Sequence, residues 1–265
     1  MRRLLIALLL TLPGLGQAAQ KPLLALVIDD LGYSWSQARQ ALELPGNHSY
    51  AIIPDTLYDE RIARLGAHMK RELLLHIPMQ SSSNLALEAT TLNDGMDENE
   101  LTAQVERMLR RLPQVHGINN HMGSRLTSEG YIMRPVMETI RRLDPSLYFL
   151  DSKTTGHSQA YLQALLTGLP TLQRDIFLDN DPQPEAMAIQ VRRWQRKAEK
   201  QGWAIAIAHP HQATLDYLQQ VLPKLLENYR MVTLSQLFAL LNPEKTTWPK
   251  QYLSRLPMAS RNSKP

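Results

Sequence analysis

The sequence predicts an α/β protein built as a (β/α) barrel of seven to eight parallel strands. Two observations favour this class. Short apolar runs alternate with amphipathic helical segments seven or eight times along the 265 residues. A polar residue, usually Asp or His, stands at the carboxyl end of nearly every apolar run, as Asp29 and His76 do. A doubly wound sheet would gather such residues at one switch point, so the barrel is preferred.

The first expected strand, Leu23–Gly32, is an unbroken apolar run that ends in Asp29 and Asp30. Such a run is typical of a strand buried on both faces in a parallel sheet. Ligands of parallel sheets bind beyond the carboxyl ends of the strands, which is where the two carboxylates lie. The alternative is that an aspartate caps the next helix. Ser34 already fits that role, so the two aspartates cannot both be its N-cap.

The later apolar runs are expected to continue the same sheet. They are His48–Pro54, Glu72–Pro78, Val115–Asn119, Leu147–Leu150, a strand within Thr171–Leu178, Trp203–Ala208 and Met231–Leu234.

Helices are expected after these runs, at the segments with capping residues and helical periodicity. They are a short helix from Ser34 to Pro45, then Leu57–Met69 capped by Thr56, Asp97–Leu112, Tyr131–Leu143, Ser158–Leu166, Pro184–Lys200, Thr214–Tyr229 and Ser235–Leu241. Pro223 should kink or split the helix that contains it. The polar stretch Gln80–Gly95 is long enough for a functional loop.

The two ends of the chain differ from the body between them. Arg2 and Arg3 precede the apolar stretch Leu4–Leu12 and a small-residue run, which predicts a signal peptide at 1–19 and a periplasmic protein. No later stretch approaches the roughly 20 apolar residues of a membrane helix, so no stable membrane insertion is expected after cleavage. One domain is expected at 20–242, followed by a disordered basic tail at 243–265.

The charge of the chain argues against nucleic-acid binding, and its lack of cysteine excludes disulfides and thiolate metal sites. The formal net charge is +4, but Arg2 and Arg3 carry two of these charges and the tail a net four, which leaves −2 for the body. A near-neutral body argues against binding nucleic acid. The chain has no cysteine, which excludes disulfides and thiolate metal sites.

Imidazole and carboxylate groups are the chemistry found at the predicted strand ends. They are Asp29, Asp30, Asp55, His76, His121, Asp151, Asp179, Asp181, His209 and His211. This donor set suits a catalytic zinc or a similar divalent metal. His76 could instead be a buried structural histidine, whereas His121 lies in a predicted polar turn where a core role is not expected. His209 and His211 flank Pro210, and strand alternation allows at most one of them to face the site.

Five motifs, in the same order along the chain, resemble those of the divergent bacterial branch of the NodB-like polysaccharide deacetylases. They are Ile28–Gly32, His76–Met79, Gly117–Ser124, Phe149–Ser152 and Ala208–His211. The resemblance implies a distorted (β/α) barrel that hydrolyses N-acetyl amides of carbohydrates with the help of a divalent metal, with zinc as the expected ion.

The resemblance also implies roles for single residues. Asp29 corresponds to the general base, Asp30 and His76 to metal ligands, and His209 or His211 to the general acid. The family's second histidine, four residues after His76, is Gln80 here. The simplest replacement for that ligand is His121. Asp151 corresponds to an aspartate that orients catalytic groups, and Asn120 and Arg125 are candidates for stabilising an oxyanion.

The sequence leaves three hypotheses about the function. The first is an exported metal-dependent deacetylase or related amidohydrolase acting on an envelope glycan such as peptidoglycan. The second, motivated by Gln80, is a catalytically impaired glycan-binding or scaffold protein that retains the metal site. The third is a sugar-binding protein without metal. The substrate, the choice among zinc, cobalt and nickel, and the oligomeric state do not follow from the residues.

Overall fold

The computed structural model describes residues 21–83, 87 and 89–242. The expected signal peptide at 1–19 and the expected tail at 243–265 therefore lie outside the described residues. None of the helices in these ranges is long and apolar enough to span a membrane.

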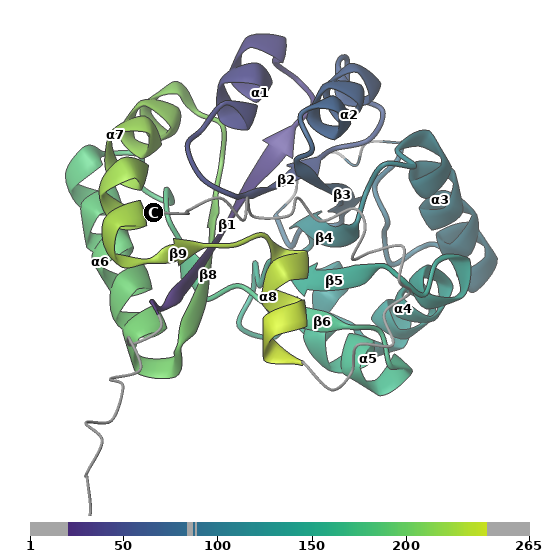
Figure 1. Ribbon diagram of the computed structural model, residues 1–265. Coiled ribbons are helices and arrows are strands. Elements are labelled where there is room, and N and C mark those ends of the chain that lie inside the picture. Colours follow the sequence, from purple (N-terminus) through teal and green to yellow (C-terminus); the bar gives the residue numbers. More distant parts are fainter. Residues whose placement is uncertain (1–20, 84–86, 88, 243–265) are drawn as a thin grey trace, which may run out of the picture.

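The strands form one curled parallel sheet surrounded by helices (Figure 1). The strands are β1 (Leu23–Leu31), β2 (Ser49–Ile52), β3 (Glu72–Met79), β4 (Gly117–Met122), β5 (Tyr148–Asp151), β6 (Thr171–Gln173), β7 (Ile176–Phe177), β8 (Trp203–Ala208) and β9 (Arg230–Met231). Their hydrogen-bonded order is β6-β5-β4-β3-β2-β1-β8-β7, and β9 pairs with the start of β1. The eight parallel strands of this order confirm the predicted (β/α) class.

The predicted sixth strand is divided into two short strands that belong to opposite edges of the sheet. β6 pairs with β5, whereas β7 pairs with β8. Only Arg174 and Asp175 separate them, so the two edges must meet at this point. The backbone N–H of Arg174 donates to the Asp151 carbonyl, and that of Asp175 donates to the Ile205 carbonyl, both at 3.0 Å. The two edges are thus joined at a seam, without a continuous ladder of hydrogen bonds between β6 and β7. This break in the ladder is how the barrel departs from a regular closed one.

The helices lie around the outside of the strands, apart from α8 (Figure 1). They are α1 (Trp35–Leu42), α2 (Asp59–His68), α3 (Glu98–Arg111), α4 (Gly130–Leu143), α5 (Ala160–Thr167), α6 (Pro184–Gln201), α7 (Gln212–Asn228) and α8 (Leu234–Leu241), with a short 3-10 turn at Leu126–Ser128.

One prediction about these helices is wrong, and of the two effects predicted for Pro223 the splitting of its helix does not occur. The hydroxyl of Thr56 donates to the Ile53 carbonyl and does not cap α2, which begins only at Asp59. α7 runs through Pro223 without being split. Its buried stripe, which includes Leu222 and Leu225 on either side of the proline, holds it against the core. Packing thus outweighs the hydrogen bond that proline removes.

The two faces of β1 contribute to two separate apolar clusters, as its unbroken apolar run predicts. Leu24, Leu26 and Ile28 pack with the outer helices. Ala25 and Val27 face the barrel interior, where inward residues of the other strands and of α8 surround them. The interior is therefore a packed core up to the carboxyl ends of the strands.

Helix α8 covers the amino end of the barrel and is held there by Glu72, the first residue of β3. The buried Glu72 carboxylate accepts hydrogen bonds from the backbone N–H groups of Leu234, at 2.8 Å, and Ser235, at 2.9 Å, and from the Ser49 hydroxyl. A carboxylate at a helix N-terminus satisfies donors that have no partner within the helix and complements the helix dipole. The carboxyl end of the barrel is left for the site.

Replacing Glu72 by glutamine should lower the free energy of unfolding by about 2 kcal/mol, because a neutral amide accepts these buried bonds less well and adds a donor that lacks a partner. Urea unfolding measures this change. The matched control is Glu98→Gln in the exposed first turn of α3, with an expected change of about 0.5 kcal/mol or less. Similar losses in the two variants would contradict the role given to Glu72.

Candidate active site and metal centre

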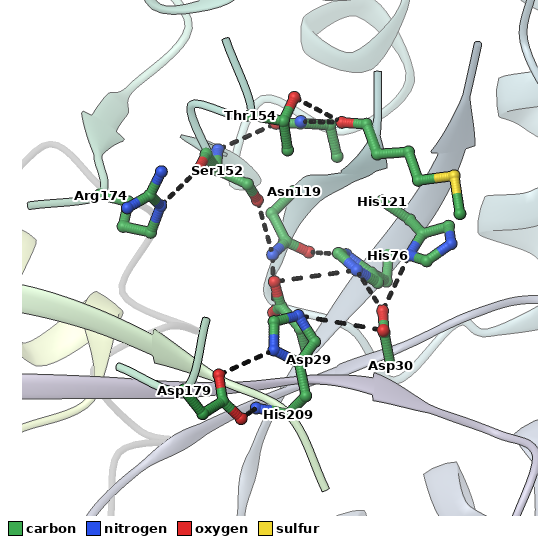
Figure 2. Close-up of polar contacts among 12 residues, drawn as sticks. Asp29, Asp30, His76, Asn119, His121, Ser152, Thr154, Arg174, Asp179 and His209 are labelled. Atoms are coloured by element: carbon green, nitrogen blue, oxygen red, sulfur yellow. Dashed lines mark hydrogen bonds and ion pairs between the residues drawn. The ribbon is translucent and has the colours of Figure 1, made fainter. Parts of the chain in front are cut away.

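A layer of polar side chains ends the apolar interior of the barrel. Strand alternation places each of them two residues beyond an inward-facing residue of its own strand. The inner apolar cluster includes Val27, Leu74, Leu150, Leu172 and Ile207. The residues two positions on are Asp29, His76, Ser152, Arg174 and His209, and Asn119 joins them by pairing with His76. One polar side chain from each of six segments thus meets at the carboxyl end of the barrel (Figure 2).

The two adjacent aspartates both point into this layer, which a regular strand would not allow. The register between β1 and β2 shifts between Ile28 and Leu31, and Asp30 has a φ of 57°. This left-handed conformation is rare for residues other than glycine, but aspartate tolerates it better than most. The bulge turns Asp30 toward the side that Asp29 already faces. Backbone strain is therefore placed at the residue that holds the centre of the site.

Asp30, His76 and His121 form the cluster best suited to hold a metal ion. Asp30 Oδ1 lies 3.0 Å from His76 Nε2 and 2.8 Å from His121 Nδ1 (Figure 2). The three ligand atoms all lie within 4.8 Å of one another. One carboxylate and two imidazoles, partly open to solvent, match the three protein ligands of a catalytic zinc site. His121 lies on β4 itself, not in the polar turn expected there.

Asn119 connects this cluster to Asp29. Its Oδ1 accepts a hydrogen bond from His76 Nδ1 at 2.7 Å, so His76 Nε2 is the nitrogen that faces the cluster. Its Nδ2 donates to Asp29 Oδ1 at 2.8 Å and to the Ser152 hydroxyl at 3.3 Å. A partner of this kind fixes the tautomer and orientation of a ligating histidine. Asn119 is not among the site residues predicted from the sequence, although its distance of two residues from His121 places both on one strand face.

The two aspartates differ in their electrostatic environment. Burial raises the pKa of Asp29, and the positive charge of His76 only partly offsets this effect. Burial acts in the same direction on Asp30, but hydrogen bonds from His121 and His76 outweigh it and hold the pKa of that carboxyl well below its usual range. Burial disfavours the charged form of His76, yet Asp29 and Asp30 together raise its pKa. Asp30 is therefore fixed as an anion, whereas Asp29 is the stronger base.

His209 reaches the same site from the end of β8 and is held by Asp179. Its Nδ1 donates to Asp179 Oδ1 at 3.0 Å, and its backbone N–H donates to Asp179 Oδ2 at 2.7 Å. The Thr214 hydroxyl also donates to this carboxylate. His209 Nε2 faces Asp30 Oδ2 at 3.9 Å. Burial lowers the pKa of His209, but the bond to Asp179 and the nearby aspartates outweigh it and raise the pKa to about 9.

Replacing Asp179 by asparagine should lower the pKa of His209 from about 9 toward its ordinary value of 6.5. Protonated His209 stabilises the fold below about pH 6.5, and this contribution is lost as the pH rises through about 9. NMR titration of the metal-free protein measures the pKa directly. Asp181→Asn is the control, because Asp181 is exposed and only accepts from the Gln183 backbone N–H. An unchanged His209 pKa in Asp179→Asn would refute the pairing.

Four sequence-predicted site residues lie outside the cluster of Asp30, His76 and His121. His211 is exposed and is the N-terminal flanking residue of α7. Asp151 accepts from Lys153, Ser158, Tyr161 and Gln173 within its own part of the fold. Asn120 donates to the Met122 carbonyl and accepts from the Ser152 N–H. Arg125 is exposed and pairs with Asp94 at 3.1 Å.

The polar groups of Gln80 are used in the neighbouring loop. Its Oε1 accepts from the Asp94 N–H at 2.9 Å, and its carbonyl accepts from the N–H groups of Arg125 and Leu126. His121 is the histidine that the structure brings to Asp30 and His76. Two carboxylates of the predicted set lie elsewhere: Asp55 pairs with Arg107 at 2.9 Å, and Asp181 bonds within its own turn.

The chain belongs to the divergent polysaccharide deacetylase family, whose model matches residues 26–238. It is 36% identical over 239 residues to the uncharacterized protein YibQ of Escherichia coli (strain K12), a match that covers 90% of this chain and 73% of YibQ. It is also 33% identical over 230 residues to an uncharacterized protein of Haemophilus influenzae, covering 87% of this chain and 80% of that protein.

Solved structures share the fold at lower identity. The uncharacterized protein ATU2773 of Agrobacterium tumefaciens C58 superposes with a TM-score of 0.77 at 21% identity, over 83% of this chain and 90% of that one. BA3943 of Bacillus anthracis, described as a CE4 family pseudoenzyme, gives a TM-score of 0.51 at 14% identity, over 82% of this chain and 66% of that one. The (β/α) fold is therefore that of the deacetylases.

Proposed function

We propose that the protein is an exported, metal-dependent hydrolase that removes an acetyl group from an N-acetylated glycan of the cell envelope. The observation that carries this proposal is that Asp29 and His209 flank the cluster of Asp30, His76 and His121. His76 Nε2 lies 3.7 Å from Asp29 Oδ2 and 3.0 Å from Asp30 Oδ1, and His209 Nε2 faces the other oxygen of Asp30. A base, an acid and a ligand cluster thus lie next to one another at the carboxyl end of the barrel.

The residues present fit a divalent metal ion, with zinc as the expected one. Asp30, His76 and His121 would hold it, and the Asn119 carbonyl already orients the outer nitrogen of His76. When bound, such an ion lowers the pKa of water and polarises an amide carbonyl. The proposed ligands are two neutral imidazoles and one carboxylate, a donor set common in catalytic zinc sites.

Asp29 would act as the general base. Its Oδ1 is fixed by the Asn119 amide, which leaves Oδ2 on the side of His76 to accept a proton from the attacking water. Burial raises the pKa of Asp29 and makes the carboxylate a better proton acceptor. Its 2% exposure limits competition from bulk water.

His209 would act as the general acid. With a pKa of about 9 it is protonated at neutral pH. Asp179 holds Nδ1, so the proton on Nε2 is the one that can pass to the departing amine. Releasing an amine without a proton is difficult, and a positioned acid typically contributes about 10²–10⁴-fold to such a step.

Acetate release from N-acetylated glycans, measured with and without a chelator, tests the proposal. Activity that is lost on chelation and restored by zinc is expected. The proposal fails if a folded, metal-loaded protein releases no acetate from any N-acetylated glycan. Recovery of a protein that starts near residue 20 from the periplasmic fraction would support the export part of the proposal.

A second candidate function is favoured by one observation. Both residues considered for stabilising an oxyanion, Asn120 and Arg125, are engaged elsewhere. A protein that binds an envelope glycan through the same site, without turnover, would keep the ligand cluster and need no oxyanion donor. It predicts stoichiometric metal and glycan binding, with no acetate released.

A further inference from the structure

Arg174 is a permanent cation of the polar layer and lies in the seam between β6 and β7. It follows the inward-facing Leu172 by two residues, and its side chain bonds to backbone carbonyls at the carboxyl end of β5. It is partly buried, yet it forms no ion pair with any carboxylate among the residues described at 21–83, 87 and 89–242. Burial lowers the pKa of Arg174, and the more distant Asp151, Asp29 and Asp175 offset this effect only in part.

The guanidinium group is held by one of its two hydrogen-bonding edges. Nε donates to the Ser152 carbonyl at 2.6 Å (Figure 2). Nη2 donates to the Lys153 carbonyl at 2.7 Å. These two nitrogens form the lateral edge of the group, so consecutive carbonyls at the end of β5 fix its plane. The terminal edge, made by Nη1 and Nη2, keeps N–H donors in the parallel geometry that matches a carboxylate or phosphate.

The Phe177 ring lies between Arg174 and His209, the proposed general acid. The guanidinium carbon lies 4.9 Å from the centre of the Phe177 ring, and the Phe177 ring stacks on His209 at 5.1 Å with an interplanar angle of 24°. Phe177 is therefore the single ring between the group that would protonate a departing amine and the free edge of Arg174. A sugar that presents its amide nitrogen to His209 would lie along Phe177, with its neighbouring substituent at Arg174.

We propose that Arg174 binds an anionic substituent, a carboxylate or a phosphate, on the sugar that carries the N-acetyl group. This inference rests on the proposed function for its choice of ligand, and it narrows the substrate class to acidic N-acetylated sugars. The terminal edge of the guanidinium group would select the orientation of the anion as well as its charge, because an oxyanion must lie in the guanidinium plane to accept two hydrogen bonds. Arg174 is thus a specificity-determining residue.

A binding comparison on the purified protein tests the inference. N-acetylmuramic acid and N-acetylglucosamine form the probe pair, because they differ by one carboxylate-bearing substituent, and N-acetylglucosamine 6-phosphate tests phosphate as the anion. NMR titration should show the acidic sugars binding about tenfold more tightly than the neutral one. Arg174→Gln should remove this preference by lowering the affinity for the acidic sugars about tenfold, with a much smaller change in the affinity for N-acetylglucosamine. Arg174→Lys, which keeps the charge but not the fork, should retain only part of it.

The control variant is Lys153→Gln, which removes an exposed cation beside Arg174 and should preserve the preference. Equal affinity for acidic and neutral sugars, no binding of the acidic sugars, or an equal loss of both kinds in Arg174→Gln would overturn the inference. The last result would show that Arg174 only holds the end of β5. Acetate release is measured in a separate assay. Selective binding of acidic sugars without hydrolysis would support this inference and contradict the proposed function.

Discussion

Replacing Asp29 by asparagine should reduce acetate release about 10²–10⁴-fold, the usual contribution of a general base. Asparagine has the shape of aspartate, and its carbonyl can still accept the bond from Asn119 Nδ2. It cannot take a proton from water at neutral pH. Zinc affinity should change little, because Asp29 is not a member of the cluster of Asp30, His76 and His121. Hydrolysis rates and zinc titrations on the same preparation separate these two effects.

The control for Asp29→Asn is Asp181→Asn, which changes an exposed carboxylate outside the site. Near-normal hydrolysis in Asp29→Asn would show that another group removes the proton. A large loss of zinc affinity in the same variant would show that Asp29 is itself a ligand. Either result would require a new assignment of the two aspartates.

Replacing His121 by glutamine should weaken zinc binding by at least about 10–100-fold, since even the loss of an outer-sphere partner has an effect of that size. The His121 side chain is 20% exposed and contacts Asp30 Oδ1, so its removal disturbs the fold less than a change at the buried His76 would. Competition with a chromogenic chelator measures the affinity. Acetate release should fall in parallel.

His157→Gln is the matched control for His121→Gln, because His157 is exposed in the turn before α5. It should bind zinc as the unmodified protein does. Unchanged affinity in His121→Gln would mean that the third ligand is another residue, and Gln80 would then have to leave its bond with the Asp94 N–H to serve.

The fold could be predicted from the sequence to a large extent because its main signal is local. The apolar run of β1 and the capping residues Ser34 and Asp97 specify their elements without reference to the rest of the chain. The division of Thr171–Leu178 could not be predicted. It arises where the curled sheet closes, and closure depends on the register of all the other strands.

The site could be predicted only in part, for a similar reason. Residue types at the strand ends indicated a larger set of aspartates and histidines, and the family resemblance implied Asp30, His76 and His121 as the ligands within it. The structure brings these three together. Neither the bulge that turns Asp30 inward nor the contact of Asn119 with both His76 and Asp29 has a local signal. Asp179 appeared among the strand-end residues, but its contact with His209 depends on the pairing of β7 with β8.

The most direct test of the proposed metal centre is a crystal structure of the zinc-loaded protein, with anomalous diffraction collected at the zinc edge. One anomalous peak is expected, bonded at about 2.0–2.2 Å to a carboxylate oxygen of Asp30, to Nε2 of His76 and to Nδ1 of His121. A peak bonded to Asp29 or Gln80 in place of His121 would contradict the proposed metal centre, as would a peak outside this cluster or none in a crystal soaked with excess zinc.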